Sequence, residues 1–149
     1  MEQIKELNIR SMVKNDWKSI LEIDSKITGK DRTSSWPQRA SSHLKTYSPS
    51  LSFVAEIEGR VVGFILVDIR GAEYALPLGG WIDGLAVDPE YHGLGIGHKL
   101  MNSCIEECHV EGIKVRLMIK ESDERLKRFI LSFGFKRGEF VEFVKGFIK

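Results

Sequence analysis

The sequence lacks most of the features that mark specialised classes of protein. Its 149 residues contain two cysteines, no apolar run near the roughly 20 residues of a membrane-spanning helix, no N-terminal signal pattern, and no repeat or low-complexity segment. These absences argue against a disulfide-stapled scaffold and a membrane protein. We therefore expect a cytoplasmic protein with no membrane partner.

An excess of charge of either sign is also missing. Lys and Arg number 22 and Asp and Glu number 21, which leaves a formal net charge of +1 at pH 7. Proteins that bind nucleic acid or anionic membranes usually carry a clear basic excess. We therefore predict no nucleic-acid partner.

The two cysteines, Cys104 and Cys108, are one helical turn apart. With His109 they would form half of a metal site, but zinc needs about four ligands and the sequence has no second Cys/His pair. The cysteines also belong to an apolar stripe at helical spacing, and unpaired cysteine is commonly buried. This pattern favours core packing, and we predict no bound metal.

The composition that is present is that of an ordinary globular domain, 42% hydrophobic and 29% charged. A chain of this length falls within the usual size of one domain, and such a domain buries about two thirds of its unfolded surface. We therefore expect residues 1–149 to form a single domain.

The order of predicted elements indicates an α/β fold with an antiparallel first half. Asn15 is expected to cap the first helix, and Glu58-Gly59 is expected to form a hairpin turn. Because the connection after residue 87 contains a helix, the fourth and fifth strands should pair in parallel. Strands are expected at 7–13, 51–57, 60–70, 81–87 and 113–120, with one or two more within 136–148, and helices at 17–27, 37–47, 95–110 and 123–133.

The most informative stretch is the glycine-dense turn at 92–97, which follows a predicted strand and opens a predicted helix. Backbone N–H groups that converge at a helix N-terminus form a phosphate cradle. A dinucleotide fingerprint would need glycine at His98, and a P-loop would need Lys followed by Ser or Thr where His98 and Lys99 stand. Both motifs are therefore excluded.

The remaining pattern resembles the acyl-CoA loop of the GNAT superfamily of N-acetyltransferases. The residues that carry the resemblance are Leu85-Ala86-Val87-Asp88-Pro89 and His92-Gly93-Leu94-Gly95-Ile96-Gly97, with His92 where the family usually has Gln or Arg. The segment Leu131-Ser132-Phe133-Gly134-Phe135 resembles the end of the family's last helix. The resemblance implies a six- to seven-stranded mixed sheet flanked by helices, splayed between strands four and five, with a bulge near Gly84.

The resemblance also implies acetyl-CoA as co-substrate. The thioester and pantetheine would bond the strand backbone at Leu85, Ala86 and Val87, and the pyrophosphate would lie on the turn amides. Lys99 is either a further charge near the phosphates or part of a solvated helix face. The residues implied in cofactor binding are Leu85, Ala86, Val87, His92, Gly93, Leu94, Gly95, Ile96, Gly97, His98 and Asp123.

Asp83 is the candidate general base, because family members often place an acid or a histidine two residues before the position of Leu85. It would take the amine proton, through one water if necessary; the alternative is a solvated strand residue. Asp68 and Glu73 are weaker candidates. The chain departs from the family at Ile130, where many members carry the tyrosine that protonates the thiolate.

The acceptor site is expected to involve the first two helices and the loop before the fourth strand. Trp36 and Trp81 are candidate walls of an acceptor pocket, although core packing explains each tryptophan equally simply. Arg32 and Arg39 are candidates to hold a carboxylate. The acceptor is therefore an amine-bearing small molecule or peptide of undetermined identity.

These patterns together predict an acetyl-CoA-dependent N-acetyltransferase that acts on a primary amine. One alternative within enzymes is a protein N-terminal α-amine acetyltransferase. An alternative of another class is an acyl-CoA-binding module with little catalysis, which the isoleucine at 130 keeps open. Edge strands permit a homodimer.

Overall fold

A computed structural model of the chain describes residues 6–30, 51–71, 75 and 77–147. It divides into two compact units, Met1–Leu117 and Met118–Lys149, which are described separately. The elements of the first unit are β1 (Leu7–Ser11), η1 (Lys14–Asp16), α1 (Trp17–Thr28), β2 (Phe53–Ile57), β3 (Arg60–Arg70), β4 (Gly79–Val87), η3 (Pro89–Tyr91), α3 (Ile96–Val110) and β5 (Lys114–Leu117).

The first unit is built on a five-stranded sheet with strand order β1-β2-β3-β4-β5. The first four strands are antiparallel neighbours, and β5 pairs with β4 in parallel after the α3 crossover. Glu58 and Gly59 close the β2–β3 hairpin with φ of 50° and 79°, the left-handed pair that a tight hairpin turn requires. The mixed α/β fold, the hairpin and the parallel pair are thereby confirmed.

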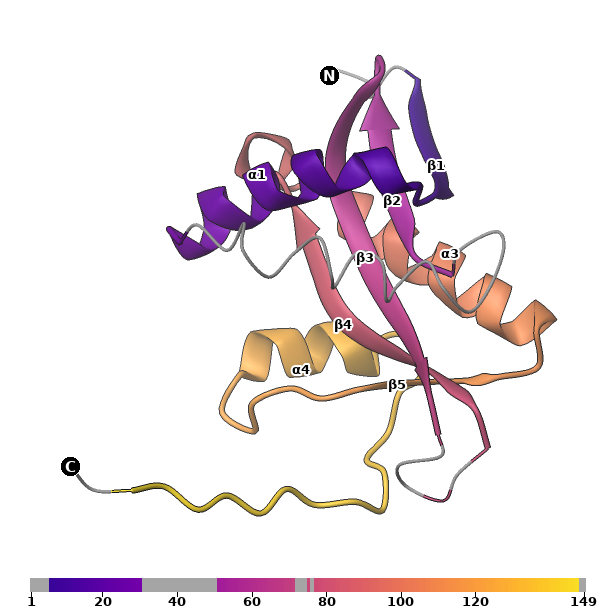
Figure 1. The fold of residues 1–149 in the computed structure, drawn as a ribbon, viewed down its shortest axis with the longest axis vertical. Helices are drawn as coiled ribbons and strands as arrows, with labels where there is room; N and C mark the ends of the chain where they lie inside the picture. The colour runs from indigo at the N-terminus through magenta and orange to yellow at the C-terminus, as the bar shows by residue number, and fades with distance from the viewer. Residues whose placement is uncertain (1–5, 31–50, 72–74, 76, 148–149) are drawn as a thin grey trace. The chain divides into compact units, whose positions relative to one another are not determined.

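Two helices cover opposite faces of this sheet, with α1 in front of the strands and α3 behind them in Figure 1. Alternation along β3 explains this division, because successive side chains of a strand point to opposite faces. Phe64 and Leu66 pack in the core cluster that contains Ile20 and Ile23 of α1. On the other face, Gly63 allows the side chain of Leu100 of α3 to approach, to 3.2 Å of where a Cβ would stand.

The α3 face contains the two cysteines. Cys104 and Cys108 are fully buried, which confirms the predicted core packing. The hydrogen bond between the two sulfurs, together with burial, raises the pKa of Cys104. A buried thiol of this kind is inert rather than reactive.

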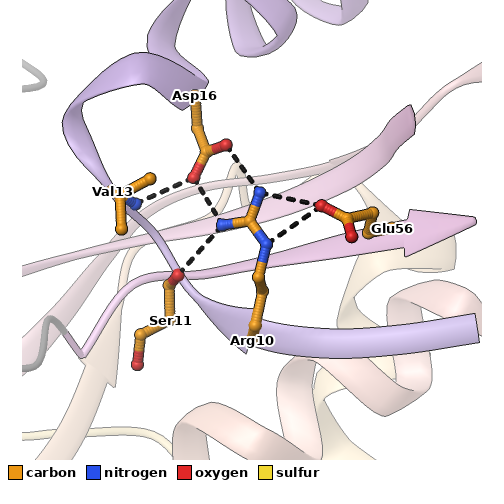
Figure 2. A network of polar contacts seen from close by, with 5 residues as sticks. All are labelled: Arg10, Ser11, Val13, Asp16 and Glu56. Atoms are coloured by element: carbon orange, nitrogen blue, oxygen red, sulfur yellow. Dashed lines mark hydrogen bonds and ion pairs between the residues drawn. The ribbon is translucent and has the colours of Figure 1, made fainter. Parts of the chain in front are cut away.

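A polar network fixes the turn from β1 into α1, as Figure 2 shows. The Arg10 guanidinium donates two hydrogen bonds of 2.8 Å to the carboxylate of Asp16 and one of 3.0 Å to Glu56 of the neighbouring strand. Asp16 in turn accepts the N–H of Val13 at 2.8 Å. Asp16, and not the expected Asn15, occupies the N-cap position of α1, but its side chain makes no capping hydrogen bond to the helix. Both residues lie within η1.

The second unit contains α4 (Glu124–Leu131). Asp123 caps this helix by accepting the N–H of Leu126 at 3.0 Å. Lys127 donates to Glu121 at 3.1 Å, and the rings of Phe129 and Phe133 meet edge to face with centroids 5.0 Å apart. The sequence leaves Ser122 and Asp123 as candidate caps of this helix, and the structure shows that the cap is Asp123.

The strands expected within 136–148 are absent from residues 136–147, so the described sheet has five strands rather than six or seven. Four of the five large apolar residues of this segment form two adjacent pairs, Phe140-Val141 and Phe143-Val144, and these four and Phe147 are all exposed. Adjacent residues of a strand point to opposite faces, so this pattern cannot bury one face alone. The helix expected at 37–47 lies outside the described residues, and the single-domain expectation for residues 1–149 stays a prediction.

No helix in the described ranges combines the length and the apolar character needed to cross a membrane.

Candidate active site

The site is organised by a β-bulge in β4. Leu66 of β3 pairs with Gly84, whereas the next residue, Val67, pairs with Ile82, so Asp83 is an extra residue in the β4 strand. A bulge bends the strand and redirects the inserted side chain. The bulge therefore lies directly before Gly84, next to the position that the sequence indicated.

The bulge divides β4 into two halves with different surroundings. Residues Gly79 to Ile82 pair with β3 on one side and with Lys114 to Leu117 of β5 on the other. From Gly84 to Val87, beyond the bulge residue, β4 pairs with β3 alone. Pairing with β5 therefore ends at Ile82, and among the described residues no strand pairs with the β5 side of the second half. The expected splay of the two strands stays a prediction.

The chain leaves this open half through a braced turn. The N–H of Asp88 donates to the carbonyl of Val62 at 2.7 Å and extends the β3–β4 ladder by one residue. The Asp88 carboxylate then accepts the N–H of Glu90 at 3.0 Å, while its carbonyl accepts the N–H of Tyr91 at 2.8 Å. These bonds fold η3 back against the end of β4.

His92 closes the turn onto the same strand. Its Nε2 lies 2.7 Å from the carbonyl oxygen of Val87, so this nitrogen must carry the proton that is donated. The imidazole thus spans the two ends of the turn, and the Val87 carbonyl is already occupied. His92, predicted to contact the cofactor, acts here as a brace of the loop, with Nδ1 as its remaining polar atom.

The loop after His92 has the open backbone that a phosphate needs. Gly93 and Gly95 have φ of 80° and 76°, and no atom lies within 4 Å of where a Cβ would stand at either residue. Gly95 is the N-cap of α3, and the first intrahelical bond runs from Lys99 to Gly95 at 3.1 Å. The N–H groups of Ile96 and Gly97 therefore precede that ladder, at the positive end of the helix dipole.

Asp88 is the buried charge at the root of this loop, 2% exposed. The ammonium of Lys26, in the last turn of α1, donates to its carboxylate at 2.8 Å, and the guanidinium of Arg60 lies 3.7 Å away. Burial alone would raise the pKa of Asp88, but the hydrogen bonds from Lys26 and the Glu90 amide outweigh it and lower that pKa. The same contact raises the pKa of Lys26, so the pair is charged at neutral pH.

Asp83, the candidate base, is held by a guanidinium. Nη2 of Arg70 lies 2.9 Å from each of its two carboxylate oxygens, and Nε of Arg70 donates to Asp68 at 3.0 Å. Burial lowers the pKa of Arg70, but Asp83 and Asp68 outweigh it and the net change is upward.

Trp81 lies in the closed half of β4 and is 9% exposed. It pairs with Asp68 on one side and Arg116 on the other, a position that suits core packing better than a pocket wall. The other acceptor-site residues expected from the sequence, Arg32, Trp36 and Arg39, lie outside the described residues. So does Glu73, a weaker candidate base.

The remaining predicted cofactor residues fall into two groups. Leu85 and Ala86 are half-buried in the open half of β4, and Leu94 and His98 are exposed beside the loop glycines. The first unit thus contains every residue predicted to bind acetyl-CoA except Asp123. Asp123 belongs to the second unit and caps α4 there.

The sequence analysis did not identify Lys26 or Arg70 as residues of the site. It named Asp88 only as part of the motif and did not predict that its side chain is buried and paired. The Lys26–Asp88 contact joins residues 62 positions apart, and no local pattern indicates such a pair. Asp88 did carry a signal, since Asp followed by Pro89 is a typical cap of a short helical turn.

Comparison with known proteins gives this arrangement a family. The sequence profile of the acetyltransferase (GNAT) family matches residues 17–135. An uncharacterized N-acetyltransferase of Methanocaldococcus jannaschii is 30% identical over 151 aligned positions, covering 93% of this chain and 65% of that protein. The chain covers between 36% and 65% of the length of the curated relatives to which it aligns.

Solved structures share the fold. Aminoglycoside N-acetyltransferase AAC(6')-Iy in complex with CoA superposes with a TM-score of 0.77 at 16% identity, covering 98% of each chain. Naa50 of Arabidopsis thaliana, in complex with the bisubstrate analogue CoA-Ac-MVNAL, gives a TM-score of 0.71 at 16% identity, covering 89% of this chain and 85% of that one. At such identities the likeness concerns the fold.

Proposed function

Because the chain belongs to the acetyltransferase (GNAT) family, we propose that it is an N-acetyltransferase that moves an acetyl group from acetyl-CoA to a primary amine. The observation that carries this proposal is the continuity of two features. The half of β4 that lacks a β5 partner, residues 83–87, runs directly into a braced loop with two open left-handed glycines, Gly93 and Gly95.

Such a loop fits a pyrophosphate for electrostatic and steric reasons. The amides before the α3 ladder present donors at the positive end of a helix, and the glycines leave room for close approach. The strand backbone at Leu85 and Ala86 would bond the pantetheine arm in the manner of an added strand. Recognition of the donor then depends on main-chain groups held in one conformation.

The chemistry needs a neutral amine, an oxyanion site and a proton for the thiolate. An amine of pKa about 10.4 costs roughly 4 kcal/mol to deprotonate at neutral pH, and Asp83 would accept that proton through a water. The amine nitrogen then bonds the acetyl carbon, and the β4 amides stabilise the oxyanion. As the carbon–sulfur bond breaks, the nitrogen releases its second proton to water and becomes the amide nitrogen. The proton for the thiolate would come from solvent, since Ile130 cannot donate one.

The proposal extends to the setting of the reaction. The acceptor would be a small amine or a peptide, since relatives of this fold include an aminoglycoside N-acetyltransferase and a protein crystallised with a CoA–peptide analogue. We place the reaction in the cytoplasm, with no nucleic-acid or membrane partner, and a homodimer would be compatible with the exposed edge strands.

One observation favours a second candidate, an acyl-CoA-binding module with little catalysis. Both oxygens of Asp83 lie 2.9 Å from Nη2 of Arg70, so the carboxylate is already engaged by a guanidinium. In the enzyme, an acceptor amine or a water must therefore compete with Arg70 for Asp83.

The experiment that decides between them measures binding and turnover separately. Calorimetry would give the Kd for acetyl-CoA, and a thiol reagent would record coenzyme A release with polyamines, amino acids, aminoglycosides and peptides bearing an N-terminal or lysine amine. We expect binding together with amine-dependent release for one acceptor class. Binding without release on any acceptor supports the module, and absence of binding overturns both.

A further inference from the structure

The helix α1 is tied to the sheet by one ion-pair cluster at each end. At its start, Arg10 bonds Asp16 at 2.8 Å, and at its end Lys26 bonds Asp88 at 2.8 Å. Between these points its buried face packs on β3. The two clusters are chemically alike, but only the second touches the loop that is proposed to bind the acyl donor.

Both oxygens of the Asp88 carboxylate, which accepts the Lys26 bond, are engaged within the protein. One oxygen of the Asp88 carboxylate accepts Lys26 and the other accepts the Glu90 amide, and the residue is 2% exposed. A carboxylate would in any case repel a pyrophosphate. Asp88 is therefore placed to hold the protein's own chain rather than a substrate.

What Asp88 holds is the entry to the donor loop. Its amide is bonded to Val62 of β3, and the short turn η3 folds around its side chain and carbonyl. Lys26 supplies the countercharge that makes burial of this carboxylate favourable, since an unpaired buried charge costs far more than a paired one. The lysine thus reaches from a different helix to stabilise the conformation that presents Gly93 and Gly95.

We propose that Lys26 and Asp88 are positioning residues for the acyl donor: their ion pair fixes the start of the 89–97 loop so that its amides are preorganised for the pyrophosphate. This inference rests on the proposed function. Preorganisation matters because a group displaced by about 1 Å can lose up to two orders of magnitude of its effect. The pair would act on donor affinity more than on the chemical step, because neither side chain approaches Asp83 in the described contacts.

The test compares the two ends of α1. Lys26→Met removes the ammonium and keeps a good helix former, Lys26→Arg retains the charge, and Asp88→Asn keeps the cap to Glu90 while removing the charge. Arg10→Met is the matched control, because it breaks the other cluster of the same helix. We expect Lys26→Met to weaken acetyl-CoA binding by about tenfold, with a similar effect on KM for acetyl-CoA and little on kcat, and Lys26→Arg to restore most of it.

The Arg10→Met control should lower the melting temperature without changing the Kd. The double variant Lys26→Met with Asp88→Asn should bind no more weakly than the worse single variant, because coupled partners act as one unit. Unchanged affinity in a folded Lys26→Met protein overturns the proposal, and so does an equal loss of affinity in Arg10→Met at matched stability.

A second measurement does not depend on the donor. Amide hydrogen exchange in the ligand-free chain should become faster in residues 89–97 of Lys26→Met and stay unchanged in β1 and β2, with the reverse pattern in Arg10→Met. If the wild-type chain binds no acetyl-CoA, the proposed function fails while the exchange pattern still supports or refutes the positioning role. Identical exchange of the loop in wild type and Lys26→Met overturns it.

Discussion

The two halves of β4 show how one strand supports both structure and recognition. From Gly79 to Ile82 it is hydrogen-bonded to strands on both sides, and Gly79, Gly80 and Trp81 are buried. From Gly84 to Val87 it has a strand partner on one side and its residues are half-buried. The closed half holds the sheet together, and in the proposed function the open half would present its backbone to the acyl donor. A single inserted residue, Asp83, marks the boundary.

The largest effect on acetyl-CoA binding is expected from a negative charge in the loop that follows the open half of β4. Gly95→Asp should weaken acetyl-CoA binding at least about a hundredfold, or roughly 3 kcal/mol, because a carboxylate would face the pyrophosphate. Gly95→Asn separates charge from strain, since asparagine tolerates positive φ about as well as aspartate. Calorimetric Kd values for both variants check this.

The matched control for that variant lies at the other end of α3. Gly112 has φ of 71°, close to the 76° of Gly95, and each has open space where a Cβ would stand. Gly112→Asp should therefore incur the same backbone strain and leave the Kd unchanged. Equal losses for Gly95→Asp and Gly112→Asp would remove the donor site from the loop.

The next effect concerns the residue at the boundary. Asp83→Asn should lower kcat by about a hundredfold if Asp83 is the base, with KM for acetyl-CoA nearly unchanged. Asp68→Asn removes the other carboxylate bonded to Arg70 and should cost less. Steady-state kinetics with a pH–rate profile provide the measurement, and a wild-type profile in Asp83→Asn would exclude it as base.

A smaller effect, on the free energy of unfolding, should distinguish glycine-to-alanine variants in the two halves of β4. A Cβ at Gly80 would lie 3.1 Å from Sγ of Cys108 and 3.2 Å from Val67, whereas at Gly84 the nearest atoms are at 3.6 Å or more. Gly80→Ala should therefore be less stable than Gly84→Ala by about 1 kcal/mol, because overpacking displaces neighbours. Urea unfolding measures this, and equal midpoints would show that the closed half is not tightly packed.

The smallest expected effect is the contribution of Asp88 to the pH dependence of folding stability. The pKa of Asp88 is lowered in the folded chain, where Lys26 and Arg60 face it, so its contribution is present above the unfolded value of about 3.9 and is lost as pH falls through the folded value. Stability measured between pH 6 and pH 2 should fall less steeply in Asp88→Asn. A steeper fall in that variant would contradict the sign.

Much of the frame was predictable because local signals were strong. β3 matched its predicted bounds, Arg60–Arg70, because a left-handed turn precedes a long apolar run, and α3 began within one residue of the prediction. The loop and its glycines were found from spacing alone. The conformation of these elements is specified by residues close together in the sequence, and a sequence pattern reports such local relations.

What could not be predicted depends on residues far apart in the chain. The Arg70–Asp83 pair requires the bulge register that brings β3 and β4 side chains together, and Lys26 meets Asp88 only once α1 lies on the sheet. The expected strands beyond residue 136 failed for a related reason. A strand forms by pairing with another strand, and neither composition nor the alternation of apolar residues predicts which strand that is.

The order of strands in the sheet has a consequence for how the chain assembles. Because the strand order is the same as the chain order, each strand can add to the one made before it, and short loop closures favour rapid formation of such contacts. The anchors of the donor loop, Lys26 and Val62, both precede it in sequence. During synthesis the loop would thus settle onto supports that have already emerged, and pulse-labelled hydrogen exchange during refolding should show β2 and β3 protected no later than residues 88–92.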